Sequence, residues 1–140
     1  MISSFRKYFK FILPIMILII VIGLVFSRVY QPETGIPEPE MRISANEAKD
    51  HIGKAAEVCG DVANARFISN IEGQPTFINF GLPDPNQDFT AVIWGINRSK
   101  WNQPPENIYS GNEVCVLGSI KSHEGTPQIE VESPDQINLK

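Results

Sequence analysis

The sequence predicts an all-β fold, a small five-stranded Greek-key barrel with short helices, preceded by one N-terminal transmembrane helix. Two observations support this prediction. An apolar run without charges covers residues 11–26, and from residue 55 onward apolar residues alternate with polar ones, as is typical of strands. Five alternating segments with one longer connection fit a closed barrel, which has no exposed sheet edges. A β-sandwich is the competing architecture, but it normally has about seven strands.

Residues 1–10 form a basic segment and residues 11–30 an apolar one. At about 1.5 Å per residue, the uncharged run alone spans roughly 24 Å, and its tyrosine-containing flanks extend it toward the roughly 30 Å of a bilayer core. A cleaved signal peptide has a similar pattern, but no small-residue cleavage motif follows the run. We therefore expect a retained anchor, with the lipid bilayer as the partner of residues 11–30.

Charge divides the chain into a basic end and an acidic body. Residues 1–30 contain four basic and no acidic side chains, whereas residues 31–140 contain eight basic and sixteen acidic ones. The positive-inside rule then places the N-terminus in the cytoplasm and the body outside, in the periplasm or at the cell surface. The acidic body argues against a strongly basic nucleic-acid coat, and the length argues against a large multidomain enzyme.

The remaining residues divide into a spacer and a folded domain. Residues 31–42 contain three prolines and three acids, which indicates a stiff, extended linker. Residues 43–140 form the domain, which begins with a short helix over residues 44–51. Ser44 and Glu47 have the spacing of a capping box at the start of this helix.

Alternation of apolar and polar residues predicts each strand of the domain, and glycine or proline lies in most of the intervening turns. The predicted strands are residues 55–68, 76–81, 89–95, 114–121 and 128–132. The connection between the third and fourth strands contains two adjacent prolines, so any helix there is short.

Three segments of the domain together resemble a known family. They read EAKDHIGKAAEVCGDV, PTFINFGLPDPNQDFTAVIWG and GNEVCVLGSIKSHEGTPQIEVESPDQI. The stretch from Ile43 to Ile137 resembles nucleic-acid-binding-like OB-fold domains of bacterial membrane-anchored or secreted proteins, some of them associated with nuclease modules. Because these segments contain no short catalytic signature, the resemblance implies a fold more than an activity.

Cys59 and Cys115 are the only cysteines. A metal site is weakly indicated, since there is no C-x-x-C motif, and nothing marks a catalytic thiol. Two buried thiols are a further interpretation. The resemblance makes the first and fourth strands neighbours, and alternation places both cysteines on their outer faces. We therefore expect a disulfide, which suits an oxidising compartment and stabilises by on the order of 4 kcal/mol in the chain-entropy model.

The resemblance also implies where a ligand binds, because OB folds usually bind along the second and third strands. Alternation turns Phe77, Asn79, Thr90, Val92 and Trp94 outward. The two rings then form a surface on which bases or sugars could stack. The residues expected to flank this surface are Arg66, Arg98, Lys100 and Trp101. The alternative is that the aromatic rings belong to the core or are covered by a loop.

The function implied by the resemblance is that of a membrane-anchored extracytoplasmic binding module, for single-stranded nucleic acid or another extended polymer. The acidic charge argues against nucleic acid, because non-specific binding needs several aligned cations. The alternative function is a non-catalytic interaction or scaffold protein that docks another envelope protein.

We expect no enzyme activity, no cofactor and no metal. Some OB-fold relatives are Ca²⁺-dependent nucleases, and Asp61, Asp84 and Asp88 are the acids to consider here. No EF-hand spacing is present, and two of these acids lie in a proline-rich loop, where aspartate is common in turns.

Overall fold

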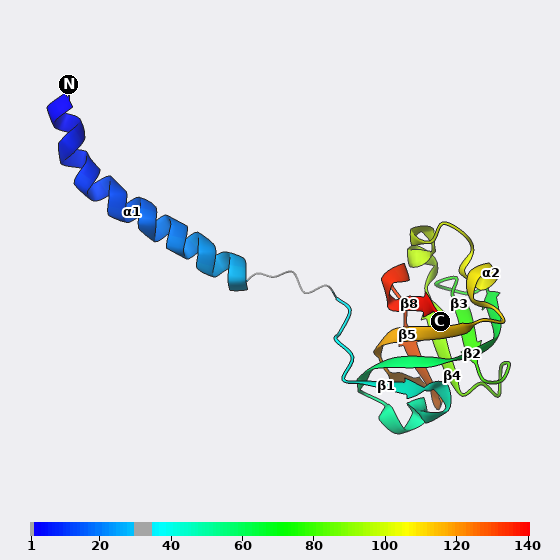
Figure 1. The fold of residues 1–140 in the computed structure, drawn as a ribbon. Coiled ribbons are helices and arrows are strands. Elements are labelled where there is room, and N and C mark those ends of the chain that lie inside the picture. Colours follow the sequence, from blue (N-terminus) through cyan, green and yellow to red (C-terminus); the bar gives the residue numbers. More distant parts are fainter. Residues whose placement is uncertain (1, 30–34) are drawn as a thin grey trace. The chain divides into compact units, whose positions relative to one another are not determined.

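The computed structural model describes residues 2–29 and 35–140, with side chains described for residues 12–25 and 35–140. Residues 1–34 and 35–140 form two separate compact units. Figure 1 shows the helix of the first unit and the strands of the second.

The first unit contains one helix, α1 (Ile2–Val29), so the apolar run is helical as expected. Its described side chains are exposed. Within the described residues, no helix is both long enough and apolar enough to cross a membrane. The predicted span over residues 11–30 includes side chains that lie outside the described ones.

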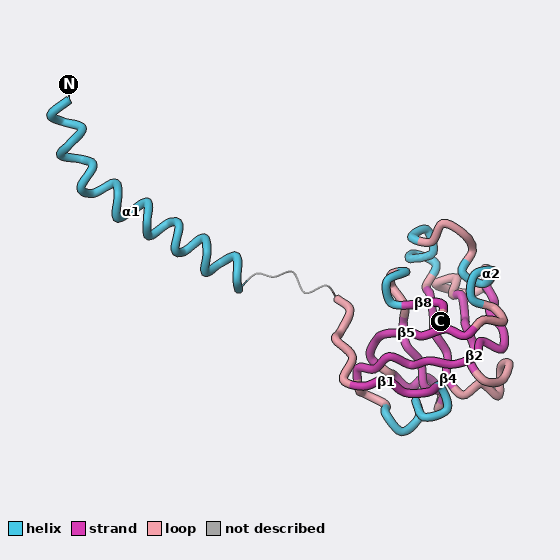
Figure 2. Tube along the Cα trace, viewed as in Figure 1, coloured by secondary structure: helices cyan, strands magenta, loops and turns pink. Residues whose placement is uncertain are grey.

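The second unit is a β barrel with short helical turns between its strands (Figure 2). Its elements in chain order are β1 (Met41–Ser44), η1 (Ala45–His51), β2 (Ala55–Phe67), β3 (Thr76–Phe80), β4 (Phe89–Ile93), η2 (Gly95–Lys100), α2 (Pro105–Tyr109), β5 (Glu113–Ser119), β6 (Lys121–His123), β7 (Thr126–Glu130), η3 (Pro134–Gln136) and β8 (Ile137–Leu139).

The pairing of the strands closes the barrel. β2, β3 and β4 form an antiparallel meander, β4 pairs in parallel with β7, and β7 pairs with β6. A single residue, Ile120, separates β6 from β5, and β5 pairs back onto β2. β5 and β6 therefore act as one bent strand, and the closed order is that of an OB-like Greek-key barrel.

The described residues form eight strands rather than the predicted five. The predicted fourth strand is divided at Ile120, whose side chain is buried in the core. β1 and β8 are additional strands that pair with β2 and β5. β1 begins at Met41, inside the predicted spacer, and neither extra strand is long enough to show a clear alternation. The capping box of Ser44 and Glu47 is confirmed, although the helix it begins, η1, is a 3₁₀ helix.

The core lies between the inner faces of β2, β3, β4 and β5. Ile78, Phe80, Phe89, Ala91 and Ile93 are fully buried, as the alternation predicts for the inward set. Three residues of the set predicted to face outward are nevertheless buried. Asn79, Thr90 and Val92 are buried as well, because other parts of the chain cover the outer face of these strands.

β5 and β7 approach each other closely at Gly118. A Cβ atom added there would lie 2.5 Å from Cγ2 of Ile129, whose side chain is itself buried in the core. Only glycine allows this approach without a shift of the packed strand.

We expect Gly118→Ala to lower the free energy of unfolding by about 1–3 kcal/mol, because the added methyl group overpacks a core that cannot yield. Urea unfolding of the full chain in detergent, followed by tryptophan fluorescence, measures the change. Gly35→Ala is the control, since a Cβ atom at Gly35 would have no atom within 4 Å. Equal midpoints for both variants would contradict the packing explanation.

Candidate functional site

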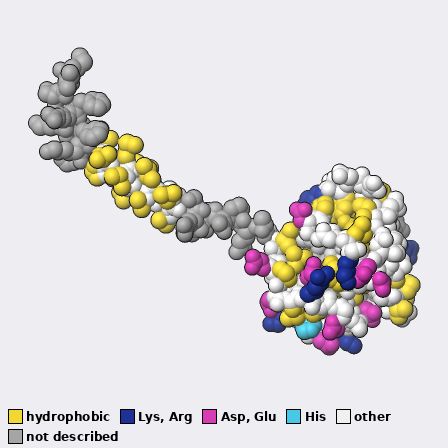
Figure 3. All heavy atoms as spheres, viewed as in Figure 1, with side chains coloured by type: hydrophobic (Ala, Val, Ile, Leu, Met, Phe, Trp, Pro, Cys, Tyr) yellow, Lys and Arg dark blue, Asp and Glu magenta, His cyan; other side chains and the backbone are white. Residues whose placement is uncertain are grey.

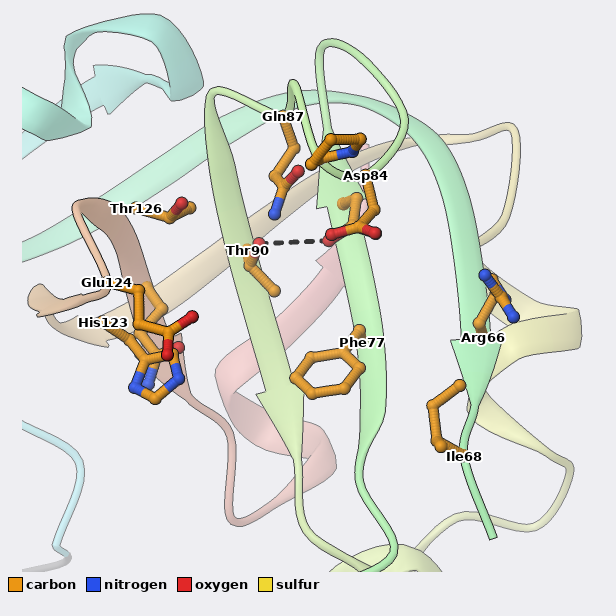
Figure 4. A pocket seen from close by; sticks show the side chains of 12 residues that line it. Arg66, Ile68, Phe77, Asp84, Gln87, Thr90, His123, Glu124 and Thr126 are labelled. Atoms are coloured by element: carbon orange, nitrogen blue, oxygen red, sulfur yellow. Dashed lines mark hydrogen bonds between the residues drawn. The ribbon is translucent and has the colours of Figure 1, made fainter. Parts of the chain in front are cut away.

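A groove of about 430 Å³ lies on the outer face of β3 and β4 (Figure 4). Its floor and walls come from three strands, the loop between β3 and β4, and the hairpin of β6 and β7. The lining residues are Arg66, Ile68, Phe77, Asn79, Asp84, Pro85, Gln87, Thr90, His123, Glu124, Thr126 and Gln128. Four of the predicted site residues, Arg66, Phe77, Asn79 and Thr90, are therefore brought together here.

Two polar side chains of the groove floor, Asn79 and Thr90, are hydrogen-bonded to each other, and Asn79 is bonded to Asn64 outside the lining. The Thr90 hydroxyl donates to Asn79 Oδ1 at 3.1 Å, and Asn79 Nδ2 donates to Asn64 Oδ1 at 3.1 Å. The three residues are register partners across β4, β3 and β2. These bonds satisfy polar groups that the groove walls shield from water, so the floor is fixed in place.

Two tight turns position the segments that form the walls of the groove. Gly81 begins the β3–β4 loop with a φ of 79°, and a Cβ atom there would lie 2.2 Å from Asp88 Oδ2. The hairpin between β6 and β7 turns through Glu124 and Gly125, both with positive φ, as in two-residue hairpin turns. The loop brings Asp84 and Gln87 to one rim, and the hairpin brings His123 to another (Figure 4).

The groove contains a stacking surface and a hydrogen-bond acceptor without a partner. The Phe77 ring is half-buried and faces the groove, with the exposed Arg66 on the neighbouring strand (Figure 4). Gln87 Oε1 is buried and has no hydrogen-bond partner among the described residues. Such an atom costs about 1–3 kcal/mol unless something donates to it, which is what a ligand can do.

The other predicted site residues lie outside the groove lining. Trp101 is buried, and its Nε1 donates to the Tyr109 hydroxyl at 2.9 Å. Burial raises the pKa of the Tyr109 phenol. The Trp94 ring packs against Gly73, and Lys100 Nζ donates to the Glu132 carbonyl at 2.7 Å. The structure therefore does not place Trp94 with Phe77 in one lining surface.

Arg98 joins four elements of the barrel. Its guanidinium donates twice to the Glu106 carboxylate, at 2.7 and 3.2 Å, and also to the Thr76 hydroxyl. It lies 3.9 Å from the centroid of the Phe67 ring. The hydrogen bonds from Arg98 hold the pKa of Glu106 below its usual range.

The predicted disulfide is present between Cys59 and Cys115, which face each other as register partners of β2 and β5. Across the described part of the chain, these cysteines and Glu57 are the one group of three metal-type ligands close together. Its sulfurs are bonded to each other and are therefore not free thiolates. Asp61, Asp84 and Asp88 do not form such a group among the described residues.

The sequence did not predict most of the groove walls. Gln87, Glu124, Thr126 and Gln128 lie in segments that the sequence predicts only as a loop, a turn or the fifth strand. The position of Glu124, Thr126 and Gln128 beside β4 follows from the parallel pairing of β4 with β7, whereas Gln87 lies in the loop between β3 and β4. The only feature of the sequence that could have indicated these wall residues is that their segments flank the expected binding strands.

No family model and no curated protein matches the chain. Among solved structures, asparaginyl-tRNA synthetase from Pyrococcus horikoshii is similar over 69% of this chain and 22% of that one, with 17% identity and a TM-score of 0.45. Aspartyl-tRNA synthetase from Entamoeba histolytica is similar over 79% and 23%, with 15% identity and a TM-score of 0.43. The chain thus spans less than a quarter of these proteins.

The Arg98–Glu106 pair predicts a stability change in acid. Because the folded-state pKa of Glu106 is lowered, its contribution is present above the unfolded-state pKa of about 4.3 and is lost as the pH falls through the folded-state value. We expect Glu106→Gln to lower the free energy of unfolding by about 1–3 kcal/mol at pH 7. The difference from the unaltered protein should shrink as the pH falls below the unfolded-state value.

Urea unfolding at pH 7 and at a series of lower pH values measures this effect. Lys140→Gln is the control, since its ion pair with Glu113 is about half-exposed and contributes at most about 1 kcal/mol. A difference between Glu106→Gln and the unaltered protein that stays constant with pH would contradict the assignment.

Proposed function

We propose that the barrel is a non-catalytic binding module whose groove holds single-stranded nucleic acid. The observation that supports this best is the half-buried Phe77 ring, which faces a groove beside an exposed Arg66. A base can stack on the ring while a neighbouring phosphate pairs with the guanidinium. The fixed floor of Asn79 and Thr90 holds the base edge in one plane.

The polar groups on the rim favour particular bases. Asp84 and Glu124 accept hydrogen bonds when ionised, and the Gln87 oxygen is an acceptor without a partner. The base should therefore present donors. Cytosine and adenine carry exocyclic amines at the position where thymine carries a carbonyl oxygen. The groove is expected to prefer cytosine and adenine to thymine.

Few cations of the barrel are free to meet phosphates. Five of them are ion-paired with glutamates, namely Arg42, Lys54, Arg98, Lys121 and Lys140. On the face shown in Figure 3, basic and acidic side chains are interspersed rather than gathered in a stripe. Arg66 is the one lysine or arginine among the described lining residues. Binding should therefore be weak and depend little on salt.

Titration of labelled oligomers of about ten nucleotides tests the proposal. The full chain is used in detergent, and fluorescence anisotropy reports binding. We expect oligo(dC) and oligo(dA) to bind more tightly than oligo(dT). Phe77→Ala should weaken binding by about 1–3 kcal/mol. A plot of the logarithm of the binding constant against the logarithm of the salt concentration should have a slope of about −0.7, the value for contact with one phosphate.

Ile96→Ala is the control, because Ile96 is a highly exposed apolar side chain outside the groove lining. Equal loss in both variants would place the binding surface elsewhere. No binding of any oligomer would reject the nucleic-acid proposal and favour the alternative, in which the barrel docks another envelope protein.

We further propose that residues 11–30 anchor the protein in the cytoplasmic membrane with the barrel on the extracytoplasmic side. The uncharged run and the basic residues before it support this orientation. A disulfide is also what an oxidising compartment favours.

Fractionation of bacterial cells that express the full chain tests the anchor. The protein should stay in the membrane fraction after alkaline carbonate extraction, and protease added to spheroplasts should digest the barrel. Release by carbonate, protection from protease, or a mature N-terminus beyond residue 30 would each contradict this arrangement.

A further inference from the structure

The disulfide lies under the side chain of Arg42. Arg42 belongs to β1, where its register partner on β2 is Glu57. Its Nε lies 3.3 Å from Cys59 Sγ, and its Nη2 lies 3.2 Å from Cys115 Sγ. The same guanidinium forms an ion pair with Glu57 at 3.1 Å. One cation thus contacts both sulfur atoms.

This contact favours the reduced form of the pair over the oxidised form. A disulfide carries no charge and its sulfur atoms are weak acceptors, so it gains little from a guanidinium. A thiolate carries a full negative charge, and a neighbouring arginine lowers the pKa of its thiol. A sulfur that leaves as a stabilised thiolate also leaves faster in thiol–disulfide exchange.

The two cysteines differ in the exposed fraction of the residue. Cys59 is partly exposed, whereas Cys115 is 5% exposed. An attacking thiolate therefore reaches Cys59. The ladder between β2 and β5 pairs seven residues of each strand, so the strands stay together when the sulfur bond breaks. Reduction can then take place in the folded barrel.

We propose that Cys59–Cys115 is a thiol–disulfide exchange site that a dithiol opens in the folded protein and that Arg42 activates. A thiolate of the dithiol attacks Cys59 Sγ and forms a mixed disulfide, while the Cys59–Cys115 bond breaks and its electron pair stays on Cys115 Sγ beside Arg42. The second thiol of the dithiol loses its proton to water and attacks its own partner sulfur. Cys59 leaves as a thiolate, and two electrons have passed from the dithiol to the protein.

Reduction of the full chain in detergent by dithiothreitol tests this proposal. Samples are quenched with iodoacetamide, and the mass of the intact chain reports the fraction reduced. We expect the rate to rise linearly with dithiothreitol concentration and to fall by about threefold or more in Arg42→Gln. Lys54→Gln is the control, because Lys54 pairs with Glu40, is similarly exposed and has no described contact with the sulfurs. Its rate should equal that of the unaltered protein.

Glu57→Gln tests the same contact without changing Arg42. Removal of the carboxylate frees the guanidinium and takes a negative charge away from the sulfurs, so reduction should become faster.

In the reduced protein, the pH dependence of alkylation should give a thiol pKa below about 8.5, and Arg42→Gln should raise this pKa. Far-UV circular dichroism of the reduced protein should retain the strand signal.

Three results would overturn the proposal. A rate that becomes independent of dithiothreitol concentration would show that the barrel must open first. Equal rates for Arg42→Gln and the unaltered protein would remove the role of the cation. A slower reaction in Glu57→Gln would reverse the expected electrostatic effect.

Discussion

The barrel depends on β2, which must pair with β5 along its first half and with β3 along its second. No straight strand can serve both partners around a closed sheet, and the register shift between Val62 and Asn64 marks where β2 changes partner. Both candidate sites follow from this division. The half that pairs with β5 sets Cys59 opposite Cys115, and the half that pairs with β3 sets Asn64 beside Asn79 at the groove floor.

The alternation of apolar and polar residues was sufficient to predict the principal strands. Each of these strands buries one face, so every second residue along it is apolar. Ala56, Val58 and Val62 are buried as that pattern requires. The same alternation placed both cysteines on outer faces, and the disulfide confirms their pairing. β1, β6 and β8 were not predicted as separate strands, because three or four residues contain too little periodicity to distinguish a strand from a loop.

The candidate site was predictable only in part, since its walls are assembled by contacts between distant segments. Phe77, Asn79 and Thr90 could be assigned to one face, but their burial depends on the β3–β4 loop and on the β6–β7 hairpin. Arg98 and Trp101 matched the residue types of a ligand site. They instead bond to Glu106 and Tyr109, eight positions further along the chain, and no sequence pattern identifies those partners.

The position of the disulfide also limits how far the chain can be stretched. A pull on the segment before Gly35 acts first on β1, which is held to β2 by four register pairs. Once β1, η1 and the residues of β2 before Cys59 have also detached, the tension passes through the sulfur bond from Cys59 to Cys115 and bypasses the 55 residues between them. Those residues represent about 190 Å of extended chain. The residues between the two cysteines therefore cannot be extended by a pulling force while the disulfide is intact, and they can be extended once it is reduced.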